Sequence, residues 1–162
     1  MPRNVVPEGV NHLSGEFAQN ELICQFIDMQ QEVVQLAYGS AFNTSCENPL
    51  ADLLKNLSPA VQLFSEAANR GVRFVLAPLD ATVYGEWEKF TLPETHPTTP
   101  ISPYGITKLT LEHYAYLYTV TCRLKFVCFC SPNANGVGQR SFVGQGFVAS
   151  AIAADRLARQ KF

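Results

Sequence analysis

Apolar residues recur along the chain with two different periods, and segments of the two kinds alternate. A repeat near 3.6 residues predicts an amphipathic helix, whereas a short continuous or alternating apolar run predicts a strand. Residues 41–48 are polar and residues 86–102 are rich in proline, so both segments are expected to be loops. The predicted elements are helices over 20–29, 49–70, 103–120 and 147–159, and strands over 32–38, 72–77 and 124–130.

The longest helical pattern begins at Pro49 and ends before Gly71. Pro49 suits the first turn of a helix, and Gly71 stands where a helix carboxyl end is expected. Pro59 is expected to kink or split this helix, because it removes a backbone donor in the middle of the run. The apolar residues that carry the helical period are Leu50, Leu53, Leu54, Leu57, Val61, Phe64 and Ala68.

The runs at 72–77 and 124–130 are apolar almost throughout, which predicts strands that are buried on both faces. Strands that alternate with helices indicate a parallel sheet with right-handed crossover connections. A length of 162 residues is typical of a single domain. The predicted fold class is therefore α/β.

Composition narrows the class of protein but does not name its chemistry. Hydrophobic residues make up 47 % of the chain and charged residues 16 %, as in globular domains. The formal net charge of −2 gives no reason to expect nucleic acid or an anionic membrane as a partner, and no run is long enough for a membrane span. Five scattered cysteines favour reduced thiols in a cytoplasmic protein, and neither they nor the histidines have the spacing of a metal site.

The most informative residues for chemistry are Tyr104 and Lys108, at the start of the helix predicted over 103–120. Residues four apart lie one above the other on the same face of a helix. An ammonium beside a phenol favours the phenolate and lowers the phenol's pKa, which is ordinarily about 10. Such a tyrosine can exchange a proton with a sugar hydroxyl near neutral pH. A surface pair without function is the alternative interpretation of this spacing.

Further motifs surround this pair in a fixed order. Residues 82–86 read Thr-Val-Tyr-Gly-Glu, residues 100–105 read Pro-Ile-Ser-Pro-Tyr-Gly, and residues 133–136 read Asn-Ala-Asn-Gly. Their order and spacing resemble the extended short-chain dehydrogenase/reductase family, and within it the UDP-glucose 4-epimerase-like group of NAD-dependent epimerases and dehydratases. The resemblance extends approximately over residues 11–150.

This resemblance implies a partial Rossmann-type, doubly wound parallel sheet that binds NAD and acts on a nucleotide sugar. Tyr104 would be the catalytic acid/base, and Lys108 would hold the nicotinamide ribose and tune Tyr104. Thr82 would supply a hydroxyl for catalysis and substrate binding, and Asn133 would touch the sugar nucleotide. Beside Tyr104 and Lys108, the implied cofactor-binding residues are Glu16, Phe17, Leu36, Ala37, Tyr38, Asn56 and Pro132. The resemblance also implies a homodimer formed through the helices near 49–70 and 103–120.

Some of these positions have a plain structural alternative. Asn56 could cap or kink the helix around Pro59, and Leu36 and Ala37 could simply belong to the core. Judged on the residues alone, the structural alternative is preferred for both.

The chain also departs from the family pattern. Nothing before Gly15 resembles the Gly-x-x-Gly-x-x-Gly turn that binds pyrophosphate, so the first βαβ glycine-loop unit is expected to be absent. Asp80 stands where the family has a serine or threonine, and a carboxylate there would oppose the ionisation of Tyr104. Cys130 and Asn135 replace an arginine and a tyrosine.

These departures leave two functional hypotheses. The chain is expected to form a single partial NAD(P)-binding domain over 1–162, without a C-terminal substrate domain. It could be an NAD-dependent epimerase or dehydratase, alone or with a complementing chain, or a catalytically inactive remnant that serves as a dimerisation or binding module. In both cases the strand at 33–37 is expected to have an unpaired edge and uncovered apolar faces.

Overall fold

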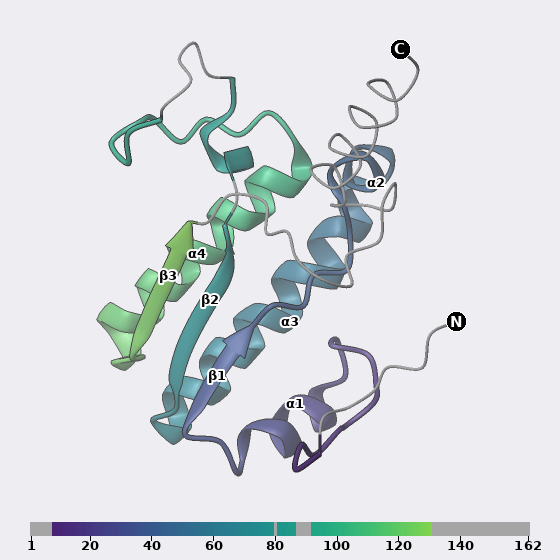
Figure 1. Cartoon of the computed structure of the whole chain (residues 1–162), viewed down its shortest axis with the longest axis vertical. Helices are drawn as coiled ribbons and strands as arrows, with labels where there is room; N and C mark the ends of the chain where they lie inside the picture. The colour runs from purple at the N-terminus through teal and green to yellow at the C-terminus, as the bar shows by residue number, and fades with distance from the viewer. Residues whose placement is uncertain (1–7, 80, 87–91, 131–162) are drawn as a thin grey trace, which may run out of the picture.

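The computed structural model of the chain describes residues 8–79, 81–86 and 92–130, and Figure 1 shows how its elements are arranged. The described helices are α1 (Asn20–Ile27), α2 (Phe42–Glu47), α3 (Pro49–Arg70) and α4 (Pro103–Cys122), with a short 3₁₀ helix η1 (Ala81–Tyr84). The strands are β1 (Glu32–Gln35), β2 (Arg73–Leu79) and β3 (Phe126–Cys130). Strands and helices alternate as the periodicity predicts, although some of the predicted boundaries move by a few residues.

The described strands form one parallel sheet in the order β1-β2-β3. Val33 lies beside Phe74 in the register, and Phe74 lies beside Phe126. Helix α3 connects β1 to β2, and α4 connects β2 to β3, so each parallel pair is joined by a helical crossover. The prediction of an α/β fold with a parallel sheet is confirmed.

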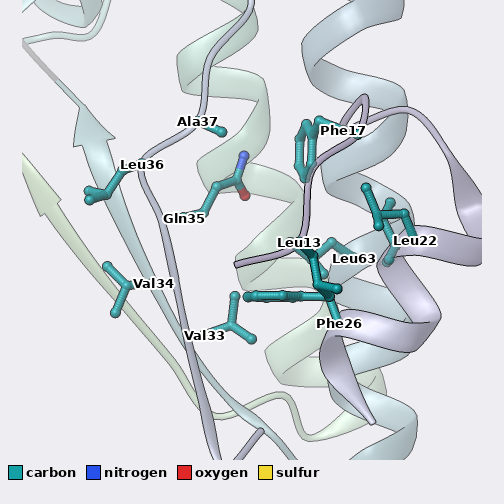
Figure 2. A pocket seen from close by; sticks show the side chains of 12 residues that line it. Leu13, Phe17, Leu22, Phe26, Val33, Val34, Gln35, Leu36, Ala37 and Leu63 are labelled. Carbon is teal, nitrogen blue, oxygen red and sulfur yellow. The ribbon is translucent and has the colours of Figure 1, made fainter. Parts of the chain in front are cut away.

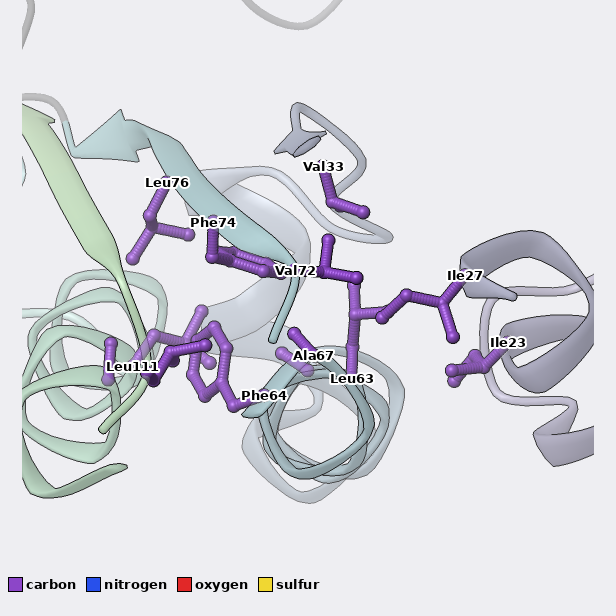
Figure 3. Packing of buried hydrophobic residues seen from close by; sticks show 13 residues of the cluster. Ile23, Ile27, Val33, Leu63, Phe64, Ala67, Val72, Phe74, Leu76 and Leu111 are labelled. Carbon is purple, nitrogen blue, oxygen red and sulfur yellow. The ribbon is translucent and has the colours of Figure 1, made fainter. Parts of the chain in front are cut away.

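The hydrophobic core lies between the sheet and a layer made of α1, α3 and α4 (Figure 3). The aromatic rings of Phe64 on α3 and Phe74 on β2 meet edge to face, with their centroids 4.9 Å apart and their planes at 83°. This arrangement adds about 0.5–1.5 kcal/mol to what the burial of the two rings contributes. Leu111 of α4 and Ile27 of α1 are fully buried in the same cluster, so all three helices are fixed to the sheet through shared contacts.

The opposite face of the sheet is apolar but exposed. Val34, Leu36, Val127 and Phe129 each leave at least half of their surface accessible. The prediction that the strand at 124–130 is buried on both faces is therefore wrong. The expectation of uncovered apolar faces beside residues 33–37 holds for one face only, because Val33 on the other face is buried. The physical reason is that α1, α3 and α4 all lie on one side of the sheet, as Figures 1 and 3 show.

Helix α3 runs without interruption through Pro59, so the expected split of this helix does not occur. It begins with Pro49 in its first turn, preceded by Asn48, whose side-chain oxygen accepts a hydrogen bond from the Ala51 amide at 3.0 Å. It ends at Gly71, which adopts the left-handed conformation with φ of 68°. Both predicted ends of the helix are confirmed.

The buried face of α3 differs from the face that the leucine pattern predicts. Leu50, Leu53 and Leu54 are exposed, whereas the polar residues Asp52 and Asn56 are each only 1 % exposed. The helix turns this way because Asp52 and Asn56 hold the segment after β1 through side-chain hydrogen bonds, and Leu63, Phe64 and Ala67 continue the same buried face. The periodicity identified the helix correctly, but it placed its amino-terminal half on the wrong face.

Residues 42–47, expected to be part of a loop, form the short helix α2. Its first turn is closed by Thr44, whose hydroxyl oxygen accepts a hydrogen bond from the Ala41 amide at 2.9 Å. Ser45 is fully buried and donates to the Phe42 carbonyl at 2.7 Å. Polar side chains that favour loops when considered locally therefore stabilise a helical turn here, because they satisfy its backbone groups.

Several sequence-based predictions concern residues outside the described ranges. They are the helix over 147–159 and the roles or substitutions discussed for Asp80, Pro132, Asn133 and Asn135. Within residues 8–79, 81–86 and 92–130, no helix is both long enough and apolar enough to cross a bilayer.

Candidate functional site

The amino end of α4 is fixed by two serine hydroxyls. Ser102 precedes the helix, and its Oγ accepts a hydrogen bond from the Gly105 amide at 3.0 Å. Ser45 of α2 accepts a hydrogen bond from the Tyr104 amide at 3.2 Å. Both amides belong to the first turn, where a helix has no backbone partners for its N–H groups. The turn that carries Tyr104 is thereby held by its own cap and by a neighbouring helix.

Tyr104 and Lys108 lie on the same buried face of α4, and each is only 2 % exposed. The Lys108 Nζ atom lies 4.9 Å from the centroid of the Tyr104 ring. The spacing of four residues thus brings an ammonium next to a phenol, as the sequence pattern predicts. The two residues are therefore not a surface pair. A buried lysine is rare, because its charge must be compensated by the groups around it.

Tyr38, three residues beyond the end of β1, completes this cluster. Its ring centroid lies 4.1 Å from Lys108 Nζ, closer than that of Tyr104. The two tyrosine rings meet edge to face, with centroids 4.9 Å apart and an angle of 69° between their planes. The ammonium therefore lies against two aromatic rings, an arrangement that stabilises a cation by the ring quadrupoles.

The hydroxyl of Tyr38 is buried and has no hydrogen-bond partner among the described residues. Burial raises the pKa of the Tyr38 phenol far above its usual value, and the nearby negative charge of Asp52 raises it further. Tyr38 is therefore neutral at physiological pH. It differs in this respect from a tyrosine that must ionise to catalyse proton transfer.

A buried polar network lies behind the cluster and joins α3 to α4 and to the segment after β1. The Asp52 carboxylate accepts hydrogen bonds from Ser40 and from the Thr107 hydroxyl, the latter at 2.6 Å. Asn56 donates through Nδ2 to Ser40 Oγ at 3.1 Å and to the Asp52 backbone carbonyl at 2.8 Å, while its Oδ1 accepts from the Gly39 amide at 2.6 Å. The role of this network is to fix the backbone on either side of Tyr38.

These contacts show what the Asn56 side chain binds within the protein. Its side chain does not cap α3, since the amino end of the helix is capped by Asn48. It binds instead to the segment that follows β1, next to Tyr38. Asn56 therefore positions part of the candidate site.

Thr82 lies in η1, which packs against the beginning of α4. Its side chain is half-buried, and its backbone carbonyl would lie 2.7 Å from a Cβ atom built on Gly105. The Cβ carbon of Pro100 would lie 2.9 Å from the same position. Only glycine at 105 allows η1 to approach α4 so closely, and this approach brings the residue after Tyr104 next to the Thr82 backbone.

A second group of predicted cofactor-binding residues lines an apolar pocket beside β1 (Figure 2). Phe17, Leu36 and Ala37 border this pocket, which has a volume of about 360 Å³ and is also lined by α1 and α3. Leu36 nevertheless exposes 70 % of its surface and points away from the core (Figure 2), so the alternative that it is a core residue is wrong. Glu16 is exposed and is not among the residues that line the pocket.

Among the described residues that line this pocket, Gln35 alone has a strongly polar side chain. It is 4 % exposed, and its Oε1 atom is buried without a hydrogen-bond partner among the described residues. Sequence reasoning missed both Gln35 and Asp52. For Gln35 the available signal was a polar residue inside an apolar strand. For Asp52 the leucine pattern predicts exposure, so no local signal indicated its burial.

The described residues contain no group of three or more histidine, cysteine, aspartate or glutamate side chains that could hold a metal ion. Cys24, Cys46 and Cys122 are free thiols.

Comparison with known proteins places this geometry in a family. A sequence model of the NAD dependent epimerase/dehydratase family matches residues 3–160. The UDP-glucose 4-epimerase of Halalkalibacterium halodurans is 26 % identical over 113 residues, which cover 70 % of this chain and 34 % of the relative. The UDP-glucose 4-epimerase of Lacticaseibacillus casei is 24 % identical over 145 residues, which cover 88 % of this chain and 44 % of the relative.

Solved structures of epimerases share the fold. UDP-glucose 4-epimerase of Thermus thermophilus, in complex with NAD, superposes with a TM-score of 0.84 at 28 % identity and covers 91 % of this chain and 49 % of its own. The Thermotoga maritima enzyme with UDP-glucose has a TM-score of 0.82 at 24 % identity, over 90 % of this chain and 48 % of its own, which shows the fold alone.

The matched region of this chain corresponds to between about a third and a half of the length of these relatives. The family model nevertheless matches nearly every residue of the chain, and the parallel sheet agrees with the Rossmann-like fold of the solved epimerases. The family that the motifs indicated is thus confirmed, and the chain belongs to the NAD-dependent epimerase/dehydratase family.

Proposed function

We propose that this chain binds NAD and supplies the proton-transfer pair of a nucleotide-sugar epimerase or dehydratase. The observation that carries the proposal is the burial of Tyr104 and Lys108 on one face of α4, with Lys108 Nζ 4.9 Å from the Tyr104 ring centroid. A phenol and an ammonium in this arrangement form an acid/base group whose protonation the positive charge can tune.

The pocket beside β1 supports a bound cofactor. It is roomy and mostly apolar, as small-molecule sites usually are, and one buried acceptor without a partner among the described residues, Gln35 Oε1, borders it. Buried polar atoms without a hydrogen-bond partner are costly, so a ligand that donates a hydrogen bond to Gln35 would remove that cost. Phe17, Leu36 and Ala37 would surround one end of NAD, and Lys108 would meet its nicotinamide ribose.

The chain's own residues would divide the chemistry as follows. Tyr104 takes a proton from a sugar hydroxyl or returns one, and Lys108 stabilises the phenolate that forms. Asn56 and Asp52 hold the backbone beside the site. Thr82 would form a hydrogen bond with the sugar. When bound, NAD supplies the position that accepts and returns a hydride. The names of the relatives, which specify UDP-glucose 4-epimerases, support a nucleotide sugar as the substrate class.

Cofactor binding is the first test of this proposal. NAD at a hundredfold excess over its Kd is expected to stabilise the purified chain by about 2.7 kcal/mol, because a ligand that binds only the folded state shifts the unfolding equilibrium. The measurement is thermal unfolding with and without NAD. Lys108→Ala is expected to lose most of this stabilisation, and Lys125→Ala, a change at an exposed lysine, is expected to retain it.

Each variant is compared with itself in the absence of NAD, so any loss of intrinsic stability cancels. A folded wild-type chain that NAD does not stabilise at millimolar concentration would contradict the proposed cofactor site.

A second candidate function, a dimerisation module, rests on a different observation. Helices α3 and α4 pack side by side, and both carry exposed apolar residues on their outer surfaces. Apolar patches of this kind commonly mark protein–protein contacts. The residues are Leu50, Leu53 and Leu54 on α3, and Ile106, Tyr114, Tyr116, Leu117 and Val120 on α4. We propose that these two helices form a homodimer interface.

The double variant Leu53→Lys/Leu117→Lys is expected to convert a dimer into a monomer, because each exposed lysine places a charge at a contact that apolar burial would stabilise. Light scattering coupled to size-exclusion chromatography measures the mass directly. Val127→Lys makes the same change at an exposed valine of β3, on the bare face of the sheet, and is expected to leave the dimer intact. A monomeric wild-type chain, or a dimer that persists in the double variant, would argue against this interface.

A further inference from the structure

The Tyr38 ring covers the Lys108 ammonium in this structure. Its centroid lies 4.1 Å from Nζ, which is a contact distance that leaves no room for another atom between them. Lys108 is 2 % exposed and Tyr104 is likewise 2 % exposed. A ligand hydroxyl that is to meet Nζ from the side of Tyr38 must therefore take the place of this ring.

The backbone that carries Tyr38 is held more firmly than its side chain. The next residue, Gly39, donates its amide to Asn56 at 2.6 Å, and Ser40 is bound to Asp52 and Asn56. The Tyr38 hydroxyl, by contrast, is buried without a hydrogen-bond partner among the described residues. Rotation of the ring away from Lys108 would bring this buried hydroxyl into contact with water, and its hydration would favour the open position.

Contacts of the aromatic ring hold it in the closed position. They are the cation–π contact with Lys108 and the edge-to-face contact with Tyr104. Both contacts depend on the ring and neither depends on the hydroxyl. Removal of the ring should consequently open the site, whereas removal of the hydroxyl alone should leave it closed.

We propose that Tyr38 is a gate over Lys108, and that NAD binds at this end of the site only when the Tyr38 ring has moved off the ammonium. That the ligand is NAD rests on the proposed function. That the Tyr38 ring covers Lys108 does not depend on it. It assigns Tyr38 a role in controlling access, in addition to any contact with the bound cofactor.

The covering of Lys108 is tested without any cofactor. The rate at which acetic anhydride acetylates Lys108 is measured by mass spectrometry and normalised to the exposed Lys125. If the open form is about a tenth of the population, Tyr38→Ala is expected to accelerate labelling of Lys108 by about tenfold. Tyr38→Phe, which keeps the ring, is expected to label no faster than the wild type.

Tyr38→Leu provides a second opening variant with an apolar side chain, in case the alanine variant does not fold. Circular dichroism and a melting curve establish which variants are folded. Equal labelling rates at Lys108 in the wild type and in a folded Ala or Leu variant would overturn the gate.

The role toward the cofactor is tested by titration with NAD and with ADP, which has no nicotinamide ribose. Tyr38→Ala is expected to bind NAD about tenfold more tightly than the wild type and to bind ADP with unchanged affinity. Equal affinities for NAD would overturn the gate's role in cofactor binding. If labelling of Lys108 is faster in the variant but no variant binds NAD, the proposed function is contradicted. The conclusion that Tyr38 covers Lys108 would still hold.

Discussion

Under the proposed function, replacing Tyr104 by phenylalanine is expected to lower the turnover of a nucleotide sugar such as UDP-glucose by about 10²- to 10⁴-fold, the range that general acid–base catalysis contributes. The substitution removes one oxygen and keeps the aromatic ring. The edge-to-face contact with Tyr38 and the contact with Lys108 therefore persist, and the buried face of α4 keeps its shape. NAD binding is expected to change little, because the loss concerns proton transfer and not the cofactor.

Two measurements separate these effects: the rate of epimerisation at saturating UDP-glucose, and the Kd for NAD. Tyr116→Phe makes the same chemical change on the same helix at a residue that is 66 % exposed, and it is expected to retain full turnover. Undiminished turnover in Tyr104→Phe would assign proton transfer to another group. A parallel loss of NAD affinity would mean that the phenol mainly binds the cofactor.

Replacing Asp52 by alanine is expected to destabilise the fold by about 3 kcal/mol. The carboxylate is 1 % exposed and accepts hydrogen bonds from Thr107, Ser40 and Asn56. A hydrogen bond to a charged group contributes about 1.5–3 kcal/mol. The substitution also leaves buried donors without an acceptor, which costs further stability. Chemical denaturation at equilibrium measures the free energy of unfolding.

A double-mutant cycle with Thr107→Val isolates the interaction between α3 and α4. Valine has the shape of threonine without the hydroxyl, so the buried donor disappears together with its acceptor. The coupling energy between the two substitutions is expected to be about 1–2 kcal/mol. Additive effects of the two substitutions would show that the 2.6 Å contact contributes nothing of its own.

The same network explains why Asp52 also affects the candidate site. Through Ser40 and Asn56 it fixes the backbone that follows β1, on which Tyr38 is mounted. Loss of Asp52 is therefore expected to disturb the Tyr38–Lys108 contact as well as stability. This connection is a property of side chains that lie 12 to 55 positions apart in sequence.

Much of the architecture could be predicted from the sequence because its signals are local. The 3.6-residue period between Pro49 and Gly71 depends on neighbouring residues only, and both helix ends carry residues with strong backbone preferences. The proximity of Tyr104 and Lys108 could also be predicted, because residues four apart on a helix lie on the same face. The family also followed from motifs whose order along the chain can be read directly.

Three of the errors have a common physical cause, since each concerns a contact between distant segments. Leucines at 50, 53 and 54 carry a strong local pattern, but the face of α3 that is buried is set by Asp52 and Asn56 binding the segment after β1. Residues 42–47 have a loop-like composition, and Ser45 makes them helical partly by meeting the Tyr104 amide. The apolar run at 124–130 predicts burial, but the described helices cover only one face of the sheet.

The sequence by itself therefore determined the α/β class, the ends of α3, the family, and the proximity of Tyr104 and Lys108 in the candidate site. These features follow from backbone preferences, periodicity and fixed spacing, all of which act over a few residues. Only the tertiary structure decided which faces are buried, that Asp52 and Gln35 are internal, and that the Tyr38 ring covers Lys108. Those features depend on contacts between segments that are distant in sequence, and a local sequence pattern does not predict such contacts.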